Sequence, residues 1–197
     1  DGAVALAHLV ASLPRLRSLE LSANAIADRG AAELGSAAAE STSLRELALG
    51  RNRISNSGAA GLAWGVSRSR SLRALHLFEN VVGDPGTAAI AGALVSSHTL
   101  ALLSLSSNNV GNAGVEALCA PLARRGPVRD LRLAGNRIGD DGLRALAEAV
   151  RAGRSLVALG LSYNRLSDEG AAALVDAVRE CPTLARLDVR GNRLGEG

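Results

Sequence analysis

The sequence predicts an α/β solenoid, in which a short strand and a helix alternate many times around one continuous core. The main observation is a pattern, L-x-x-L-x-L-x-x-N-x-I, that spans residues 16–26 and returns every 28 residues without insertion or deletion. Fixed periods of this size are typical of stacked repeat architectures. The copies start at Leu16, Leu44, Leu72, Leu100, Val128, Leu156 and Leu184.

The repeats predict one domain over residues 1–197. It contains a partial repeat over 1–15, six full repeats that start at 16, 44, 72, 100, 128 and 156, and a partial repeat over 184–197. Repeat arrays need polar caps over their terminal units, and neither end shows one. We therefore expect a fragment of a longer chain, or ends that are covered by neighbouring subunits.

Within each copy, leucines such as Leu47 and Leu49 alternate with polar or small residues, which predicts a strand with one buried face. Strands that recur in one direction with helices between them predict a parallel sheet and right-handed crossovers. A D/N-x-G turn follows each strand, and its first residue is predicted to be the N-cap of the next helix. These first residues are Asp28, Asn56, Asp84, Asn112, Asp140 and Asp168. Leu34 and Ala38, four residues apart, mark the buried stripe of the first complete helix.

The extended pattern in residues 156–178, with Asn, the D-x-G turn and the L-A-x-A-L-like helix, resembles the ribonuclease-inhibitor-like subfamily of leucine-rich repeats. The resemblance covers the whole chain. The uniform period is more similar to the arrays of NOD-like receptors and of the Ran GTPase-activating protein than to ribonuclease inhibitor itself. The resemblance implies a curved horseshoe with strands on the concave face and helices on the convex face.

One asparagine in each repeat is interpreted as structural. A side-chain amide both donates and accepts, so it can satisfy backbone groups where the strand turns, and the row would form a ladder between repeats. The ladder consists of Asn24, Asn52, Asn80, Asn108, Asn136, Asn164 and Asn192.

Binding residues are expected where the repeat leaves positions free on the concave face. Phe78 and Tyr163, two of the three aromatic residues, fall there and are candidate anchors, although they could instead cover a loop edge. The candidate protein-binding residues are Glu20, Arg51, His76, Phe78, Glu79, Arg132, Tyr163, Asp188 and Arg190.

Two further features have competing interpretations. Trp64 is predicted to face outward on the convex side, where it either docks a partner or fills a gap beside Gly61 and Gly65; the gap is favoured. An arginine row lies beside the asparagines, and pairing with acidic residues of the adjoining turns is favoured over contact with an acidic partner. The row contains Arg53, Arg137, Arg165 and Arg193.

The composition excludes several classes of function. All 22 basic residues are arginine, so the lysine that P-loop and Schiff-base chemistry require is absent. The net charge is only +3, so nucleic acid is not an expected partner. The sequence contains no run of about 18 apolar residues, so no membrane-spanning segment is predicted. Cys119 and Cys181 lie two repeats apart, too far for a disulfide, which favours a reduced, intracellular and cytoplasmic setting.

The histidines His8, His76 and His98 do not share a metal-ligand spacing, and no nucleophile is matched to a base. We therefore predict a non-enzymatic protein-interaction module with no cofactor, no metal and no catalytic residues, which binds a protein partner on its concave face. The alternatives are a GTPase-activating regulator similar to the Ran activator, or a structural subunit of a large assembly.

Overall fold

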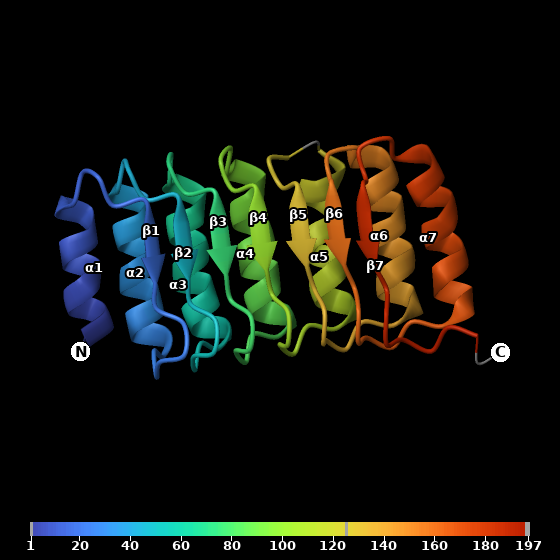
Figure 1. Ribbon diagram of the computed structural model, residues 1–197, viewed down its shortest axis with the longest axis horizontal. Coiled ribbons are helices and arrows are strands. Elements are labelled where there is room, and N and C mark those ends of the chain that lie inside the picture. Colours follow the sequence, from blue (N-terminus) through green and yellow to red (C-terminus); the bar gives the residue numbers. More distant parts are fainter. Residues whose placement is uncertain (1, 125, 196–197) are drawn as a thin grey trace.

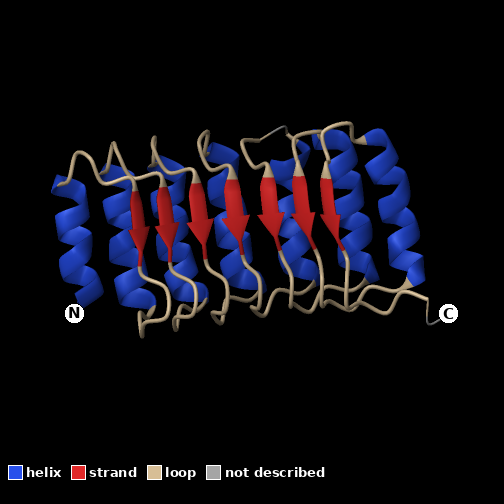
Figure 2. Ribbon diagram, viewed as in Figure 1, coloured by secondary structure: helices blue, strands red, loops and turns tan. Residues whose placement is uncertain are grey.

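The computed structural model describes residues 2–124 and 126–195. Its strands form one parallel sheet in chain order, and its helices form a second layer behind that sheet (Figures 1 and 2). The strands are β1 (Ser18–Glu20), β2 (Glu46–Ala48), β3 (Ala74–His76), β4 (Leu102–Ser104), β5 (Asp130–Arg132), β6 (Ala158–Gly160) and β7 (Arg186–Asp188). The helices are α1 (Gly2–Ser12), α2 (Asp28–Glu40), α3 (Asn56–Arg68), α4 (Asp84–Ser96), α5 (Asn112–Ala123), α6 (Asp140–Gly153) and α7 (Asp168–Glu180).

The strand register repeats the sequence period. Leu19 pairs with Leu47 and Leu131 pairs with Leu159, so each strand is shifted from its neighbour by one repeat. The predicted leucine-rich-repeat solenoid is confirmed. Because neighbouring units are equivalent, a residue type that recurs at one register forms a continuous row along the array.

The core lies between the two layers. Leu47 and Leu49 are buried on the inner side of the sheet, and Leu34 and Ala38 are buried on the facing side of α2. The remaining strand residues point away from the helices, and we call this outer surface the strand face. The outer surface of the helix layer is the helix face. None of the described helices has both the length and the apolarity that a membrane crossing requires.

Strands and helices run in opposite directions, which gives the array two long edges. At one edge the strands end and the helices begin; we call it the turn edge, and it lies at the bottom of Figure 1. At the other edge the helices end and the next strands begin; we call it the return-loop edge, and it lies at the top of the same view. The two edges use their side chains differently.

Candidate functional site

The asparagine row at the turn edge is engaged in hydrogen bonds between repeats. Asn108 is buried, and its amide donates to the carbonyl of Leu77 in the preceding repeat at 2.8 Å and to that of Leu105 at 3.2 Å. Its Oδ1 accepts the amide of Val82 at 2.9 Å. Equivalent bonds are made by Asn52, Asn80, Asn136, Asn164 and Asn192. Asn24 differs, since it donates only to carbonyls of its own repeat and is exposed.

The N-cap prediction for the D/N-x-G turns is wrong. Helix α3 is capped by Ser55, and Asn56 is already its first residue. The Asp28 carboxylate, one repeat earlier, accepts the Ser55 amide at 2.7 Å and the Ser55 hydroxyl at 2.6 Å. The Asp or Asn at the start of each helix thus stabilises the start of the next one, because that neighbouring N-terminus lies beside it. The same link joins Asn56 to Gly83, Asp84 to Gly111, Asn112 to Gly139 and Asp140 to Ser167. The Asp168 carboxylate likewise accepts the amide of Gly195.

This link also explains the glycine of the turn. A Cβ at Gly170 would lie 2.2 Å from Oδ1 of Asp140, and one at Gly114 would lie 2.6 Å from Oδ1 of Asp84. The hydroxyl and amide of Ser167 donate to Asp140 and lower the pKa of its carboxyl. The D/N-x-G signature therefore belongs to two adjacent repeats, and its carboxylates are engaged in structure.

On the strand face, the N-terminal half forms separate local pairs. His76 lies 3.2 Å from the Glu46 carboxylate, and Arg51 donates to Glu79 at 3.0 Å. His76 and Glu79, which lie three residues apart, therefore contact different partners. The ring of Phe78 is half-buried and occupies the space where a Cβ of Gly50 would lie. Glu20 is exposed at the outer strand β1.

The C-terminal half contains a hollow instead. A depression of about 180 Å³ opens over β6, where Gly160 has no side chain. Asp130 and Arg132 line it from β5, and Arg186 and Asp188 line it from β7. Arg132 and Asp130 form an ion pair at 2.8 Å within one strand.

Tyr163 and Arg190 do not line this hollow but follow its lining residues toward the turn edge, since Tyr163 comes directly after Ser162. Arg190 pairs with Asp188 at 2.7 Å, and its hydrogen bonds hold the pKa of that carboxyl well below its usual range. Tyr163 is 68% exposed and lies over Gly191, whose Cβ would meet the tyrosine ring at 2.5 Å. The strand face thus presents its most exposed aromatic residue beside its charged hollow.

Sequence reasoning named Arg132, Tyr163, Asp188 and Arg190 but overlooked one outward register of the sheet. The strand pairing places Glu46, Asp130 and Arg186 in that register, which lies two residues before the register of Arg132 along each strand. The signal was present, because residues two positions apart in a strand share a face.

The gap-filling interpretation of Trp64 is wrong. A Cβ at Gly61 would meet Ala32 at 2.5 Å, and one at Gly65 would meet the Gly35 carbonyl oxygen. These glycines therefore allow close approach of α2 and α3, and they leave no space for a ring. Trp64 is 47% exposed on the helix face, with the Arg68 guanidinium 4.6 Å from its ring centroid.

The favoured local pairing of the arginine row is also wrong. Among residues 2–124 and 126–195, no carboxylate lies within 4.0 Å of Arg53, Arg137, Arg165 or Arg193. The turn carboxylates bind the next helix start or Arg144 instead. Arg137 donates to the neutral side chain of Asn109 at 3.0 Å.

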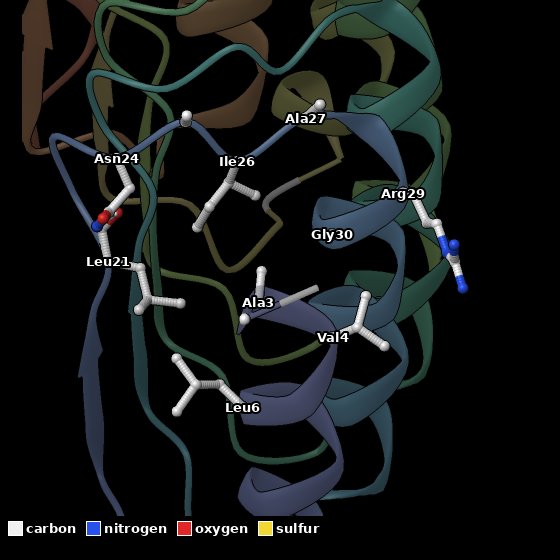
Figure 3. Close-up of a pocket in the computed structure, with 11 residues that line it drawn as sticks. Ala3, Val4, Leu6, Leu21, Asn24, Ile26, Ala27, Arg29 and Gly30 are labelled. Atoms are coloured by element: carbon white, nitrogen blue, oxygen red, sulfur yellow. Dashed lines mark hydrogen bonds between the residues drawn. The ribbon is translucent and has the colours of Figure 1, made fainter.

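Another hollow, of about 410 Å³, lies at the N-terminal end of the described chain. Ala3 and Leu6 of α1 face Leu21 and Ile26 across it (Figure 3). It is located on the side of β1 that has no strand neighbour in the described chain. The hollow therefore belongs to the end of the array.

Other reactive groups stand apart. In the described chain, no group of three or more His, Cys, Asp and Glu residues is arranged to hold a metal ion. Cys119 and Cys181 are both free thiols. Burial, together with the charge of Glu116, raises the pKa of Cys119 to about 11.

Several solved structures share this fold. An internalin C2 from Listeria monocytogenes aligns with a TM-score of 0.61 and 23% identity, over 94% of this chain and 66% of that one. A leiomodin-1 actin-binding site 2 structure aligns with a TM-score of 0.59 and 14% identity, over 91% and 87%. The C-terminal domain of tropomodulin from Caenorhabditis elegans aligns with a TM-score of 0.58 and 15% identity, over 91% and 93%. At these identities the likeness concerns the fold alone.

No curated protein matches the chain by sequence. The family described as Leucine Rich repeat matches six segments, which are residues 13–35, 40–63, 68–91, 96–119, 127–147 and 154–175. These segments cover most of the chain and follow the repeats seen in the sheet and the helix layer. The chain therefore belongs to the leucine-rich-repeat family, whose arrays are a type of protein-interaction module.

Proposed function

We propose that this protein binds a protein partner through its strand face, with the hollow over β6 as the centre of the interface. The observation that carries the proposal is the arrangement of charge around that hollow. Asp130 faces Arg186 across Ala158, and Arg132 faces Asp188 across Gly160. Two strand spacings, about 9.6 Å, separate the backbones that carry these opposite charges. Within the described residues no ion pair joins them across the floor, because Asp130 pairs with Arg132 and Asp188 with Arg190.

A partner side chain of either sign would find an opposite charge at the wall of this hollow. Ala158 and Gly160 have small side chains, so the floor leaves room for the partner side chain. Three of the wall charges, Asp130, Arg132 and Asp188, are already held by ion pairs. Groups held in position before binding lose little freedom when the partner arrives. The geometry therefore favours recognition of a charged side chain that projects from a partner surface.

The remaining candidates extend the proposed interface outward. Tyr163 offers an exposed, rigid ring directly after the lining residue Ser162, the kind of residue that anchors interfaces. Phe78, His76 and the Arg51–Glu79 pair lie further along the same face, within six strand spacings, or about 29 Å. That length fits one standard interface. The GTPase-regulator and structural-subunit alternatives stay predictions.

The test is to fill the hollow. Gly160→Leu is compatible with the backbone, because a Cβ there meets nothing closer than the Arg132 Cα at 3.8 Å. Peptides would first be selected on the wild-type protein from a random phage-displayed library, and their Kd values measured by calorimetry. We expect Gly160→Leu to weaken most selected peptides by at least about ten-fold.

Gly92→Leu provides the matched control, since it adds the same side chain without a change of charge at an exposed glycine of α4, where a Cβ meets nothing within 4 Å. We expect it to change the Kd less than about two-fold. Unchanged binding to the Gly160→Leu variant would exclude the hollow as the centre of the site.

A further inference from the structure

The seven return loops have an unusual charge. They contain nine arginines and no aspartate or glutamate, although the whole chain carries a net charge of only +3. The rest of the chain therefore carries a net charge of −6. The basic residues that look evenly spread along the sequence are thus segregated in space, because the described residues of the return loops lie on the same edge of the array (Figure 1). The loops are 13–17, 41–45, 69–73, 97–101, 124–129, 154–157 and 181–185.

The densest part lies at the first three loops. Arg17, Arg45 and Arg73 share one register, and backbone hydrogen bonds of 2.7 Å join each to the next. Arg15 and Arg70 add two further charges beside this row. All five side chains are exposed. At a strand spacing of about 4.8 Å, the row is a continuous positive line along the edge.

A structural role would be the ordinary explanation for such arginines. Cations near helix C-termini satisfy free carbonyls and complement the helix dipole. Arg129 has a related structural role, since it donates to the return-loop carbonyls of Gly126 at 3.3 Å and Ser155 at 3.0 Å. Within the described ranges, the arginines of the first three loops make no side-chain hydrogen bond and no ion pair. Their charge is therefore available to another molecule.

The chemistry of the edge favours one class of polyanion. Single-stranded nucleic acids are held by aromatic residues on which bases stack, and the return loops contain none. Stable peripheral membrane binding combines electrostatic attraction with an inserted apolar surface. In the first three loops, Leu13 is the exposed large apolar residue among arginines and serines. A polypeptide rich in aspartate and glutamate needs neither, because guanidinium groups bind carboxylates directly.

We propose that the return-loop edge of the first three repeats binds an extended acidic polypeptide segment of a protein partner. The row of Arg17, Arg45 and Arg73 pairs with alternating carboxylates of that segment, and Arg15 and Arg70 contact its flanks. This surface is separate from the hollow over β6, so the proposal stands without the strand-face site.

The experiment uses a fluorescent peptide of roughly twelve residues in which glutamate and serine alternate, long enough to cross the row. Its binding is followed by anisotropy at several salt concentrations. The test variant replaces Arg15, Arg17, Arg45 and Arg73 with serine. The control variant replaces Arg53, Arg137, Arg165 and Arg193 of the turn edge with serine. Both variants change the net charge from +3 to −1, so they match in total charge and differ in where it is lost. The control also loses the Arg137–Asn109 hydrogen bond, which lies on the turn edge.

We expect the test variant to weaken peptide binding by at least about ten-fold and the control by less than about two-fold, with wild-type affinity falling as salt rises. Circular dichroism and size-exclusion chromatography establish that both variants are folded. Equal weakening in the two variants would overturn the proposal, since it would mean that only the overall charge matters. Tighter binding to single-stranded RNA or to phosphatidylserine vesicles than to the peptide would overturn it as well.

Discussion

The two edges of the array are built from the same repeat but treat their side chains differently. At the turn edge, Asn108 bonds to the backbone of two repeats and Asp140 bonds to the start of the next helix. At the return-loop edge, only part of the loop is structural. The hydroxyls of Ser41 and Ser69 accept the amides of Leu44 and Leu72, whereas the arginines that follow them make no such bond in the described chain.

The difference shows how to separate structure from function in a repeat protein. A residue type that recurs at one register and bonds to neighbouring backbone maintains the scaffold, and changing it should destabilise the fold. A residue type that recurs but contacts nothing adds no bond to the scaffold, so its recurrence requires another explanation. Stability measurements at the two edges can test this division.

The largest expected effect is at the asparagine ladder. Asn108→Leu leaves the buried amide of Val82 without an acceptor and removes donors from the Leu77 and Leu105 carbonyls. We expect a loss of about 2–4 kcal/mol in the free energy of unfolding, measured by urea denaturation.

Asn24→Leu is the control within the same row. Its amide bonds only to its own repeat and is exposed, so we expect a loss below about 1 kcal/mol. Equal losses at the two positions would show that bonding between repeats is not what makes the ladder stabilising.

A smaller effect is expected at the turn glycines. Gly170→Ala places a Cβ against Asp140 and should cost about 1–3 kcal/mol, because either the carboxylate or the helix must shift. Gly92→Ala is the opposite case, since a Cβ there meets nothing within 4 Å and alanine favours the helix by up to about 1 kcal/mol. The same substitution should therefore change sign between the two sites, as thermal or urea unfolding can measure. An unchanged or higher stability of Gly170→Ala would contradict the close link between Asp140 and the next helix.

The sequence allowed most of the fold to be predicted, because the period of 28 residues specifies strand, turn and helix together. Its failures share one physical origin. Asp28, Trp64 and Arg165 were interpreted from their sequence neighbours, whereas their environment is set by residues 27 or more positions away. The Asp28 carboxylate bonds to Ser55, and Trp64 is exposed because helix α2 occupies the space beside Gly61.

The charged hollow was only partly predictable for the same reason. Arg132 and Asp188 were identifiable as outward-facing residues, but their position on either side of Gly160 depends on strand pairing across two repeats. Likewise, the chain's net charge of +3 concealed the basic edge, since charge that is balanced in total can still be separated in space.

The smallest stability effect is expected at the return-loop edge. Replacing Arg17, Arg45 and Arg73 with serine removes no hydrogen bond or ion pair of the described chain, so the free energy of unfolding should change by less than about 0.5 kcal/mol. Any change should be a gain, because like charges on neighbouring strands repel one another. Urea denaturation of this variant beside Asn108→Leu tests both ends of the comparison in one experiment.

The sign of that small change decides what the arginines are for. A clear loss of stability would mean that they support the helix ends, and the contrast between the two edges would fail. A gain would mean that three like charges are kept side by side at a cost to the fold. Such a cost is expected of binding surfaces, where residues are suited to a partner and leave the isolated protein less stable than it could be.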